Sequence, residues 1–245
     1  MMNPEFMSLA FLLAAAFWAA LSGPAAAEDP GAAPAAQRAL LTAEAQTAFL
    51  AVGRLNLAGQ GHCTATLIGP DLAVTAAHCL DARRAGAALR PETLHFLPGW
   101  RMGAFAAHRR GAAVARAQGD GVATDLGLIG LDAPVPVAPL PLAARPARTG
   151  EAVAVVSYGR DRAQAPSLQT GCRITARQGP VLVTDCEALP GVSGAPLLRA
   201  AGVGWEVVGV VSARTGSRAA PSGAALAVAL DAHLPALRAQ LEAGR

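Results

Sequence analysis

The sequence predicts an all-β fold, and three observations lead to this prediction. Short apolar runs of four to eight residues recur along the chain, turn residues (glycine, proline and aspartate) separate them, and 53% of all residues are hydrophobic, enough for a core. Many short strands with regular turn signals favour a sandwich or a barrel. The expected strands are Phe49–Val52, Cys63–Ile68, Leu72–Thr75, Leu126–Leu131, Ala152–Ser157, Val181–Thr184 and Trp205–Ser212.

The N-terminal segment has the pattern of an export signal. An uncharged apolar run, Met7–Leu21, is followed by the helix breakers Gly23-Pro24 and by three alanines that end at Ala27. We therefore expect a signal peptide over residues 1–27, cleaved after Ala27, and a periplasmic or secreted protein. Glu5, with no Lys or Arg beside it, is atypical of such a signal. A retained membrane anchor is the alternative, but the run is short for a spanning helix.

Three further segments stand out by composition. Residues 28–45 are rich in Ala and Pro and lack strand periodicity, so we expect a lead-in or a propeptide. Pro134–Pro141 holds four prolines in eight residues, which excludes the middle of a sheet and suits a stiff connector. Asp231–Leu241 has leucines at helical spacing, which predicts an amphipathic closing helix.

Charge and cysteine content narrow the possible functions. The formal net charge is +3, and all 20 basic residues are arginines that are scattered along the chain without aromatic platforms, so we expect no nucleic-acid partner. Four cysteines in an exported chain indicate disulfides, for which three connectivities exist. Because no Cys-x-x-Cys and no His pair with ligand spacing occurs, we expect neither a metal nor another cofactor.

Three separate stretches carry residue types suited to nucleophilic catalysis. A strand runs into a turn that ends on His78 and Cys79, and Asp125 precedes a nearly all-apolar run, which places its carboxylate at the edge of a buried surface. Ser193 lies in a glycine-rich turn, Gly191-Val-Ser-Gly-Ala-Pro196, that lets backbone N–H groups converge as an oxyanion hole requires. The nearest alternative acid, Asp120, lies between two glycines and is interpreted as a turn residue.

The three motifs follow one another in the order His, Asp, Ser. In this order they resemble the motifs of the trypsin/chymotrypsin superfamily of serine peptidases, and the resemblance extends over about residues 46–241. The resemblance implies two six-stranded antiparallel β-barrels of the chymotrypsin type with a C-terminal helix. The expected segments are a first barrel at 46–133, a proline-rich connector at 134–146, and a second barrel with the closing helix at 147–245.

The resemblance also implies an activity, that of a secreted serine endopeptidase that forms an acyl-enzyme on a protein or peptide substrate. Ser193 would be the nucleophile, His78 the base and Asp125 the orienting acid, while the N–H groups of Gly191 and Ser193 would form the oxyanion hole. His62, His95, His108 and His233 are expected on the surface or in the core. We expect the two local disulfides, Cys63–Cys79 and Cys172–Cys186.

The chain departs from the family before the nucleophile. Val192 stands where many members have an aspartate that receives the new N-terminus, so trypsin-style activation does not fit. The stretch around it resembles a bacterial branch, the glutamyl endopeptidases. Ala188 and Val211, however, replace the Thr and His those enzymes use, which disfavours glutamyl specificity.

The specificity pocket is expected to include Glu187, Ser212 and Arg214. Glu187 falls six residues before the nucleophile, where trypsin-like members place an acid, and so favours basic substrates. Arg214 would neutralise Glu187 or attract acidic side chains. The alternative function is a non-catalytic binding protein on the same fold, against which the intact triad argues. We expect a monomer without a stable membrane anchor after signal cleavage.

Overall fold

The computed structural model describes residues 36–57, 59–81, 90–215 and 223–244, apart from the side chain of Arg214. The expected signal peptide and the first part of the 28–45 segment lie outside the described residues. Within the part described, none of the helices has the length and apolar character needed to cross a membrane.

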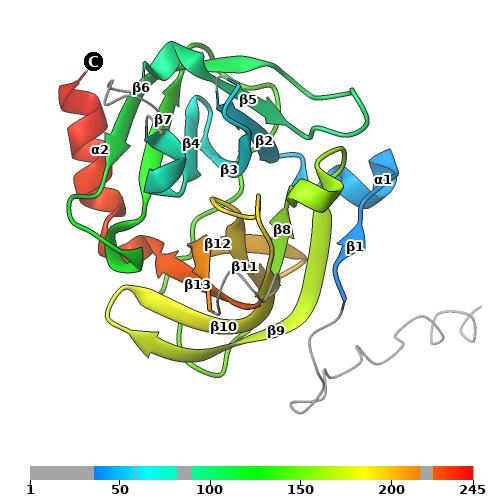
Figure 1. Cartoon of the computed structure of the whole chain (residues 1–245), viewed down its shortest axis with the longest axis vertical. Helices are drawn as coiled ribbons and strands as arrows, with labels where there is room; N and C mark the ends of the chain where they lie inside the picture. The colour runs from blue at the N-terminus through cyan, green and yellow to red at the C-terminus, as the bar shows by residue number, and fades with distance from the viewer. Residues whose placement is uncertain (1–35, 58, 82–89, 216–222, 245) are drawn as a thin grey trace, which may run out of the picture. The chain divides into compact units, whose positions relative to one another are not determined.

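Two closed six-stranded antiparallel barrels make up the fold (Figure 1), which confirms the predicted fold class. The first closes in the order β2-β3-β4-β7-β6-β5, and the second in the order β9-β10-β13-β12-β11-β8, where β8 pairs with β9. The first barrel consists of β2 (Val52–Leu57), β3 (His62–Gly69), β4 (Leu72–Thr75), β5 (Leu94–Pro98), β6 (Arg109–Arg116) and β7 (Gly127–Leu131). The second consists of β8 (Ala152–Ser157), β9 (Ser167–Gln178), β10 (Val181–Ala188), β11 (Pro196–Ala201), β12 (Gly204–Arg214) and β13 (Gly223–Ala229).

The strands differ in how much of each face they bury. Every residue of β4 and β7 is buried, whereas β10 alternates between buried and half-buried positions, as expected for a strand with only one face on the core. Strand β7 begins with Gly127, a position that has no room for a side chain because the turn with Leu80 lies against it. A Cβ atom at this position would lie 2.5 Å from Leu80 Cδ1, in the turn that carries His78.

The closing helix α2 (Leu234–Ala243) begins later than the expected Asp231, because a 3-10 turn, η6 (Leu230–Ala232), comes first. A proline in the first turn is favourable at this end of a helix. Leu237 and Leu241 are buried, and the helix packs on β6 and β7. The last segment of the chain therefore returns to the first barrel, although it follows the second in sequence.

Two N-terminal segments differ from the expectations. Phe49 is buried, but it ends the 3-10 turn η1 (Thr47–Phe49), which follows the short helix α1 (Ala43–Gln46), so the expected strand Phe49–Val52 is wrong and β2 begins only at Val52. Within the 28–45 segment, β1 (Arg38–Ala39) pairs with β9, and Leu40 is fully buried. Two residues are too few for a strand periodicity to show in the sequence.

Both expected disulfides are present. Cys63 in β3 is joined to Cys79 just after β4, with 6.3 Å between the Cα atoms, and Cys172 in β9 is joined to Cys186 in β10, at 5.1 Å. The first bridge ties the turn next to His78 to a barrel strand. The second joins neighbouring strands of the other barrel, ahead of the turn that carries Ser193.

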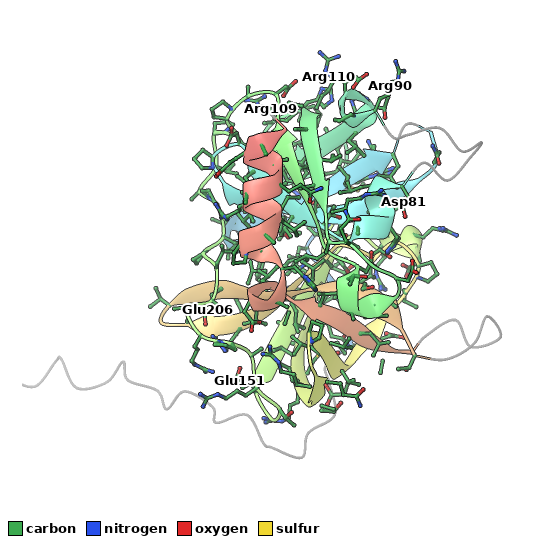
Figure 2. All side chains as sticks on the ribbon, turned by 90° about the vertical axis from the view of Figure 1, so that its left-hand side faces the viewer. Asp81, Arg90, Arg109, Arg110, Glu151 and Glu206 are labelled. Atoms are coloured by element: carbon green, nitrogen blue, oxygen red, sulfur yellow. A yellow bond between two sulfur atoms is a disulfide. The ribbon has the colours of Figure 1, made fainter. Side chains whose placement is uncertain are left out.

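A buried arginine forms ion pairs with two glutamates in the second barrel. Arg199, whose side chain is 7% exposed, donates from Nη1 to Glu151 Oε2 at 2.8 Å and from Nε to Glu206 Oε1 at 2.7 Å. Figure 2 labels the two glutamates. Burial alone would raise the pKa of Glu151, but hydrogen bonds from Arg145 and Arg199 hold it below its usual value. The three residues connect β11, β12 and the residue just before β8.

Candidate active site

His78 lies in the 3-10 turn η2 (Ala77–Leu80), one residue after β4. Both residues that follow it anchor the turn, because Cys79 is bridged to β3 and Leu80 is 1% exposed. The His78 side chain itself is 34% exposed. The imidazole of His78 is therefore accessible to solvent, while Cys79 and Leu80 hold the turn that carries it in place.

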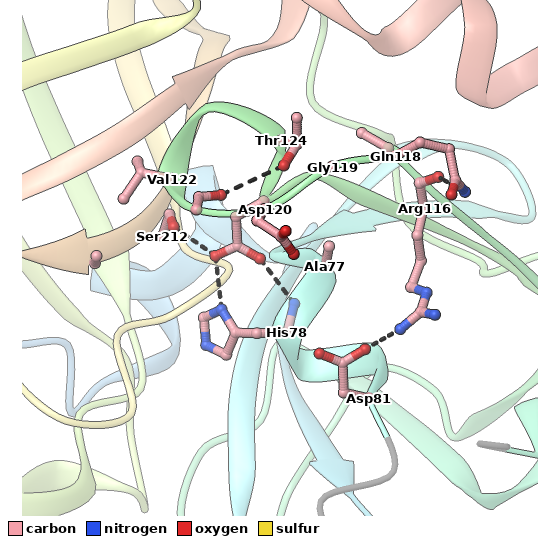
Figure 3. A pocket seen from close by; sticks show the side chains of 14 residues that line it. Ala77, His78, Asp81, Arg116, Gln118, Gly119, Asp120, Val122, Thr124 and Ser212 are labelled. Atoms are coloured by element: carbon pink, nitrogen blue, oxygen red, sulfur yellow. Dashed lines mark hydrogen bonds and ion pairs between the residues drawn. The ribbon is translucent and has the colours of Figure 1, made fainter. Parts of the chain in front are cut away.

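Asp125 follows the 3-10 turn η4 (Val122–Thr124) and directly precedes Leu126 and β7. Its Oδ1 accepts the backbone N–H of His78 at 2.7 Å, and its Oδ2 lies 2.7 Å from His78 Nδ1. The Ser212 hydroxyl also donates to Oδ2 (Figure 3). Since an ionised carboxylate only accepts hydrogen bonds, Nδ1 carries the imidazole proton, and Nε2 keeps a free lone pair.

The protonation state of Asp125 follows from its surroundings. Burial alone would raise the pKa of this carboxyl, but the hydrogen bonds from His78 and Ser212 stabilise the ionised form more strongly and hold the pKa below the usual 3.8. Asp125 is therefore a carboxylate at neutral pH. Its negative charge lies beside Nδ1 of His78.

Ser193 lies in the turn between β10 and β11, and two glycines shape that turn. Gly191 has φ 98° and Gly194 has φ 83°, in the left-handed region that disfavours any side chain. Space is also lacking, because a Cβ at Gly194 would lie 2.0 Å from the Thr64 carbonyl oxygen, and one at Gly191 would lie 2.7 Å from the Arg160 nitrogen. Only glycine fits either position.

Backbone contacts to both barrels hold the turn, and Ser193 with it, close to the first barrel. Val192 and Ala195 are buried in the core of the second barrel, and the N–H of Gly194 donates to the Val211 carbonyl at 2.7 Å. On the other side, the N–H of Thr64 in β3 donates to the Ser193 carbonyl at 2.8 Å. The serine is thus held at the junction of the two barrels.

The structure brings His78 and Asp125 together but does not bond Ser193 to them. Among the described residues, no hydrogen bond joins Ser193 Oγ to His78, a separation that is common before substrate binds. The N–H groups of Gly191 and Ser193 have no acceptor in the described part of the protein, whereas those of Val192 and Gly194 are used within the fold. Two free N–H groups at such a turn suit an oxyanion.

Two cavities meet at Ser212 and Ala213 in β12. A small one of about 120 Å³ adjoins Ser193 and is bordered by the apolar side chains of Ala188 and Val211. A larger cleft of about 530 Å³ adjoins His78 and Asp125. A substrate bound at the serine therefore has space in two adjoining cavities.

Of the residues expected in the specificity pocket, one lines the cavities and another does not. Ser212 lines both cavities, and it also bonds to Asp125, which the sequence did not indicate. Glu187 lines neither cavity; its N–H and carbonyl bond to Gln169 and Gln37, and its neighbour Ala188 faces the small cavity instead. Successive residues of a strand point to opposite faces, so a one-residue difference moves the acid out of the pocket. The side chain of Arg214 lies outside the described part.

The sequence did not predict several residues that support the candidate active site. Thr64 supports the serine turn through its N–H, its carbonyl accepts the Thr75 hydroxyl at 2.8 Å, and its own hydroxyl accepts the N–H of Tyr158 at 3.0 Å. His233 contacts the Ala123 carbonyl at 2.7 Å, within the turn η4 that directly precedes Asp125. Polar residues within otherwise apolar strands were the available signal for the threonines.

Among the described residues, the potential metal ligands do not form a site that resembles known ones. In the described ranges, the single group of three potential ligands is Cys63, His78 and Cys79, and its two sulfurs are joined as a disulfide. His95 and His108 stack with 5.0 Å between ring centroids, on β5 and just before β6, and neither lines the two cavities at the candidate active site. His62 contacts the Tyr158 carbonyl at 3.1 Å.

Two barrels, with a histidine and an aspartate on the first and a serine turn on the second, define the chymotrypsin-like class of proteins. The family model of the trypsin-like peptidase domain matches residues 63–210, more than half of the chain, and the protein belongs to this family. No curated protein matches the sequence. The narrower resemblance to bacterial glutamyl endopeptidases stays a prediction.

Proposed function

We propose that the protein is a serine endopeptidase in which Ser193 is the nucleophile, His78 the general base and Asp125 the residue that orients the base. The observation that carries this proposal is the pair of 2.7 Å contacts from Asp125 to His78, which leave Nε2 free at the barrel junction where the serine turn lies. Membership of the trypsin-like peptidase family supports protein or peptide substrates.

Catalysis then proceeds in two balanced stages. Ser193 Oγ attacks the peptide carbonyl carbon while His78 Nε2 takes its proton, and the N–H groups of Gly191 and Ser193 stabilise the oxyanion, each by about 3 kcal/mol. The C–N bond breaks as His78 returns the proton to the leaving amine, which gives an acyl-enzyme. Water, deprotonated by His78, then cleaves the ester and restores the serine.

The small cavity suggests which residue supplies the attacked carbonyl. Its volume of about 120 Å³ and the apolar residue types that predominate in its lining, among them Ala188 and Val211, suit a small aliphatic side chain. Because Glu187 lies outside this lining, we no longer propose a preference for lysine or arginine at this position.

Position 192 offers no receptor for an N-terminal ammonium group. Val192 is 1% exposed and packs among apolar side chains of the second barrel, so it offers no charge to such a group. The pairing of β1 with β9 and the burial of Leu40 support a lead-in that stays with the enzyme from Arg38 onward, instead of a propeptide removed as a whole. We propose an enzyme competent without insertion of a new N-terminus.

An oxidising compartment suits the protein. Two disulfides, Cys63–Cys79 and Cys172–Cys186, persist outside the cytosol but are rare within it. Together with the export signal expected over residues 1–27, they support a secreted or periplasmic enzyme.

Peptide hydrolysis by the wild type and by Ser193→Ala tests this proposal. The wild type should cleave members of a peptide library, and the variant should lose at least about 10⁵-fold in kcat/KM, because no other group replaces the nucleophile. Circular dichroism of both proteins controls for folding. A folded wild type that cleaves nothing, or a variant that cleaves as fast as the wild type, would contradict the proposed function and would favour a binding protein on the same fold.

A further inference from the structure

A large cleft lies directly beside the candidate catalytic pair. Its volume is about 530 Å³, and His78, Asp125 and Ser212 are among the 14 residues that line it (Figure 3). The segment between β6 and β7, residues 117–122, forms another part of its wall. A substrate whose carbonyl reaches Ser193 must pass next to this cleft, since Ser212 and Ala213 border both the cleft and the small cavity at the serine.

The charges in the cleft are not balanced. Asp81 forms an ion pair with Arg116, and Asp125 is occupied by His78 and Ser212. Asp120, in contrast, has no hydrogen bond or ion pair with any described residue. Its carboxylate is therefore available to a group that enters from solvent.

The local backbone presents Asp120 to this space. Gly119 has φ 119° and Gly121 has φ 79°, backbone conformations that favour glycine on both sides of the aspartate. Figure 3 shows the Asp120 carboxylate directed into the cleft, on the side where Ala77 and His78 lie. The sequence pattern Gly-Asp-Gly, which suggested only a turn, thus also presents a carboxylate beside the catalytic pair.

The geometry of an extended peptide connects the two cavities. Successive side chains of an extended strand point to opposite sides. A peptide that lies along Ser212 and Ala213 with one side chain in the small cavity therefore directs the neighbouring side chain toward the large cleft. The cleft has room for a long side chain, whereas the small cavity does not.

We propose that this cleft binds an arginine or lysine side chain of the substrate, at the residue that precedes the cleaved carbonyl residue, and that Asp120 is the residue that selects it. This inference rests on the proposed peptidase function and names the substrate class of the same site. The enzyme would combine a small aliphatic residue at the cleaved bond with a cation one residue earlier. Selection comes from this carboxylate, because the other two acidic side chains of the cleft, Asp81 and Asp125, already have partners.

Two peptides that differ only in charge test the proposal. One carries arginine before an alanine at the cleaved bond, and the other carries citrulline, which has nearly the same shape but no charge. The wild type should cleave the arginine peptide with a kcat/KM about fivefold higher, the range of an exposed ion pair. The ratio should fall close to one in Asp120→Asn, fall below one in Asp120→Arg, and shrink with added salt. Mass spectrometry of the products fixes the position of cleavage.

Asp132→Asn is the matched control, because Asp132 is a 40% exposed aspartate paired with Arg110 and lies outside the cleft. This variant should keep the wild-type ratio. A wild type that cleaves both peptides equally, or an Asp120→Asn variant that keeps the fivefold ratio, would overturn the inference while leaving the peptidase function intact. If the folded wild type cleaves neither these peptides nor any library member, both proposals are overturned.

Discussion

The two halves of the candidate active site are held in place by different means. In the first barrel, His78 is oriented by side-chain hydrogen bonds, all of which converge on the carboxylate of Asp125. In the second barrel, Ser193 is placed by backbone conformation, through two glycines with positive φ and through carbonyl and N–H contacts to Thr64 and Val211. One half therefore depends on a charge, and the other on the path of the chain.

This difference predicts how each half fails. Removing a hydrogen-bond donor to the Asp125 carboxylate should lower the catalytic rate while the protein still folds, since the residues around Asp125 remain packed. Adding even a methyl group to the serine turn forces the chain apart, because backbone atoms of the first barrel lie against Gly194. Substitutions in the two halves should therefore separate a loss of rate from a loss of stability.

The largest structural effect is expected for Gly194→Ala. The new Cβ would lie 2.0 Å from the Thr64 carbonyl oxygen and 2.2 Å from Thr75 Oγ1, at a φ of 83°. We expect the free energy of unfolding to fall by about 4 kcal/mol, from the strained φ and the overlap together. Urea titration of the purified variant measures this change.

Gly202→Ala is the matched control for that variant. Gly202 also has a positive φ, of 57°, but a Cβ there would meet no atom within 4 Å. Its free energy of unfolding should fall by about 1 kcal/mol, the cost of the φ angle alone. Equal losses in the two variants would contradict the view that close approach of the barrels shapes the serine turn.

A smaller effect is expected in the other half, for Ser212→Ala. The variant removes one hydrogen bond to Asp125 Oδ2 and leaves the two from His78, so kcat/KM should fall about tenfold while the protein stays folded. The pKa of Asp125 should rise toward its usual value, since this bond helps to lower it.

The pH dependence of stability checks the same variant. A carboxyl whose pKa is lower in the folded chain stabilises the fold only while it is ionised. This contribution is complete above the usual pKa of 3.8 and is lost as the pH falls through the folded-state value. Ser212→Ala should thus be less stable than the wild type near neutral pH, and the gap should narrow in strong acid. A gap that stays constant with pH would contradict this account of the carboxylate.

The sequence was most informative where chemistry requires particular residues. The disulfides followed from four cysteines and the resemblance, and the two-barrel fold was likewise implied by the family resemblance that the three motifs carry. Phe49 shows the limit of apolar runs, because burial alone does not distinguish a strand from a 3-10 turn. Strand β13, in which alanine and glycine predominate, carried too weak a strand pattern to be expected.

Site details depend on contacts that no local pattern encodes. Glu187 and Ala188 differ by one position, yet only the alanine lines the cavity, because the register of β10 decides which residue faces it. Thr64 joins the serine turn from 129 residues away, a pairing that the sequence does not reveal. Asp120 could be assigned to a turn from its glycines, but its lack of a partner among the described residues is visible only in three dimensions.

The central claim is that the two halves act together, although His78 and Ser193 share no hydrogen bond in this structure. The rate at which a fluorophosphonate probe modifies the protein measures this coupling most directly. We predict one adduct on the wild type, placed on Ser193 by mass spectrometry, and a rate roughly 10³-fold lower in His78→Ala, because the general base is lost. Modification of a different residue, or an unchanged rate in a folded His78→Ala variant, would contradict the claim.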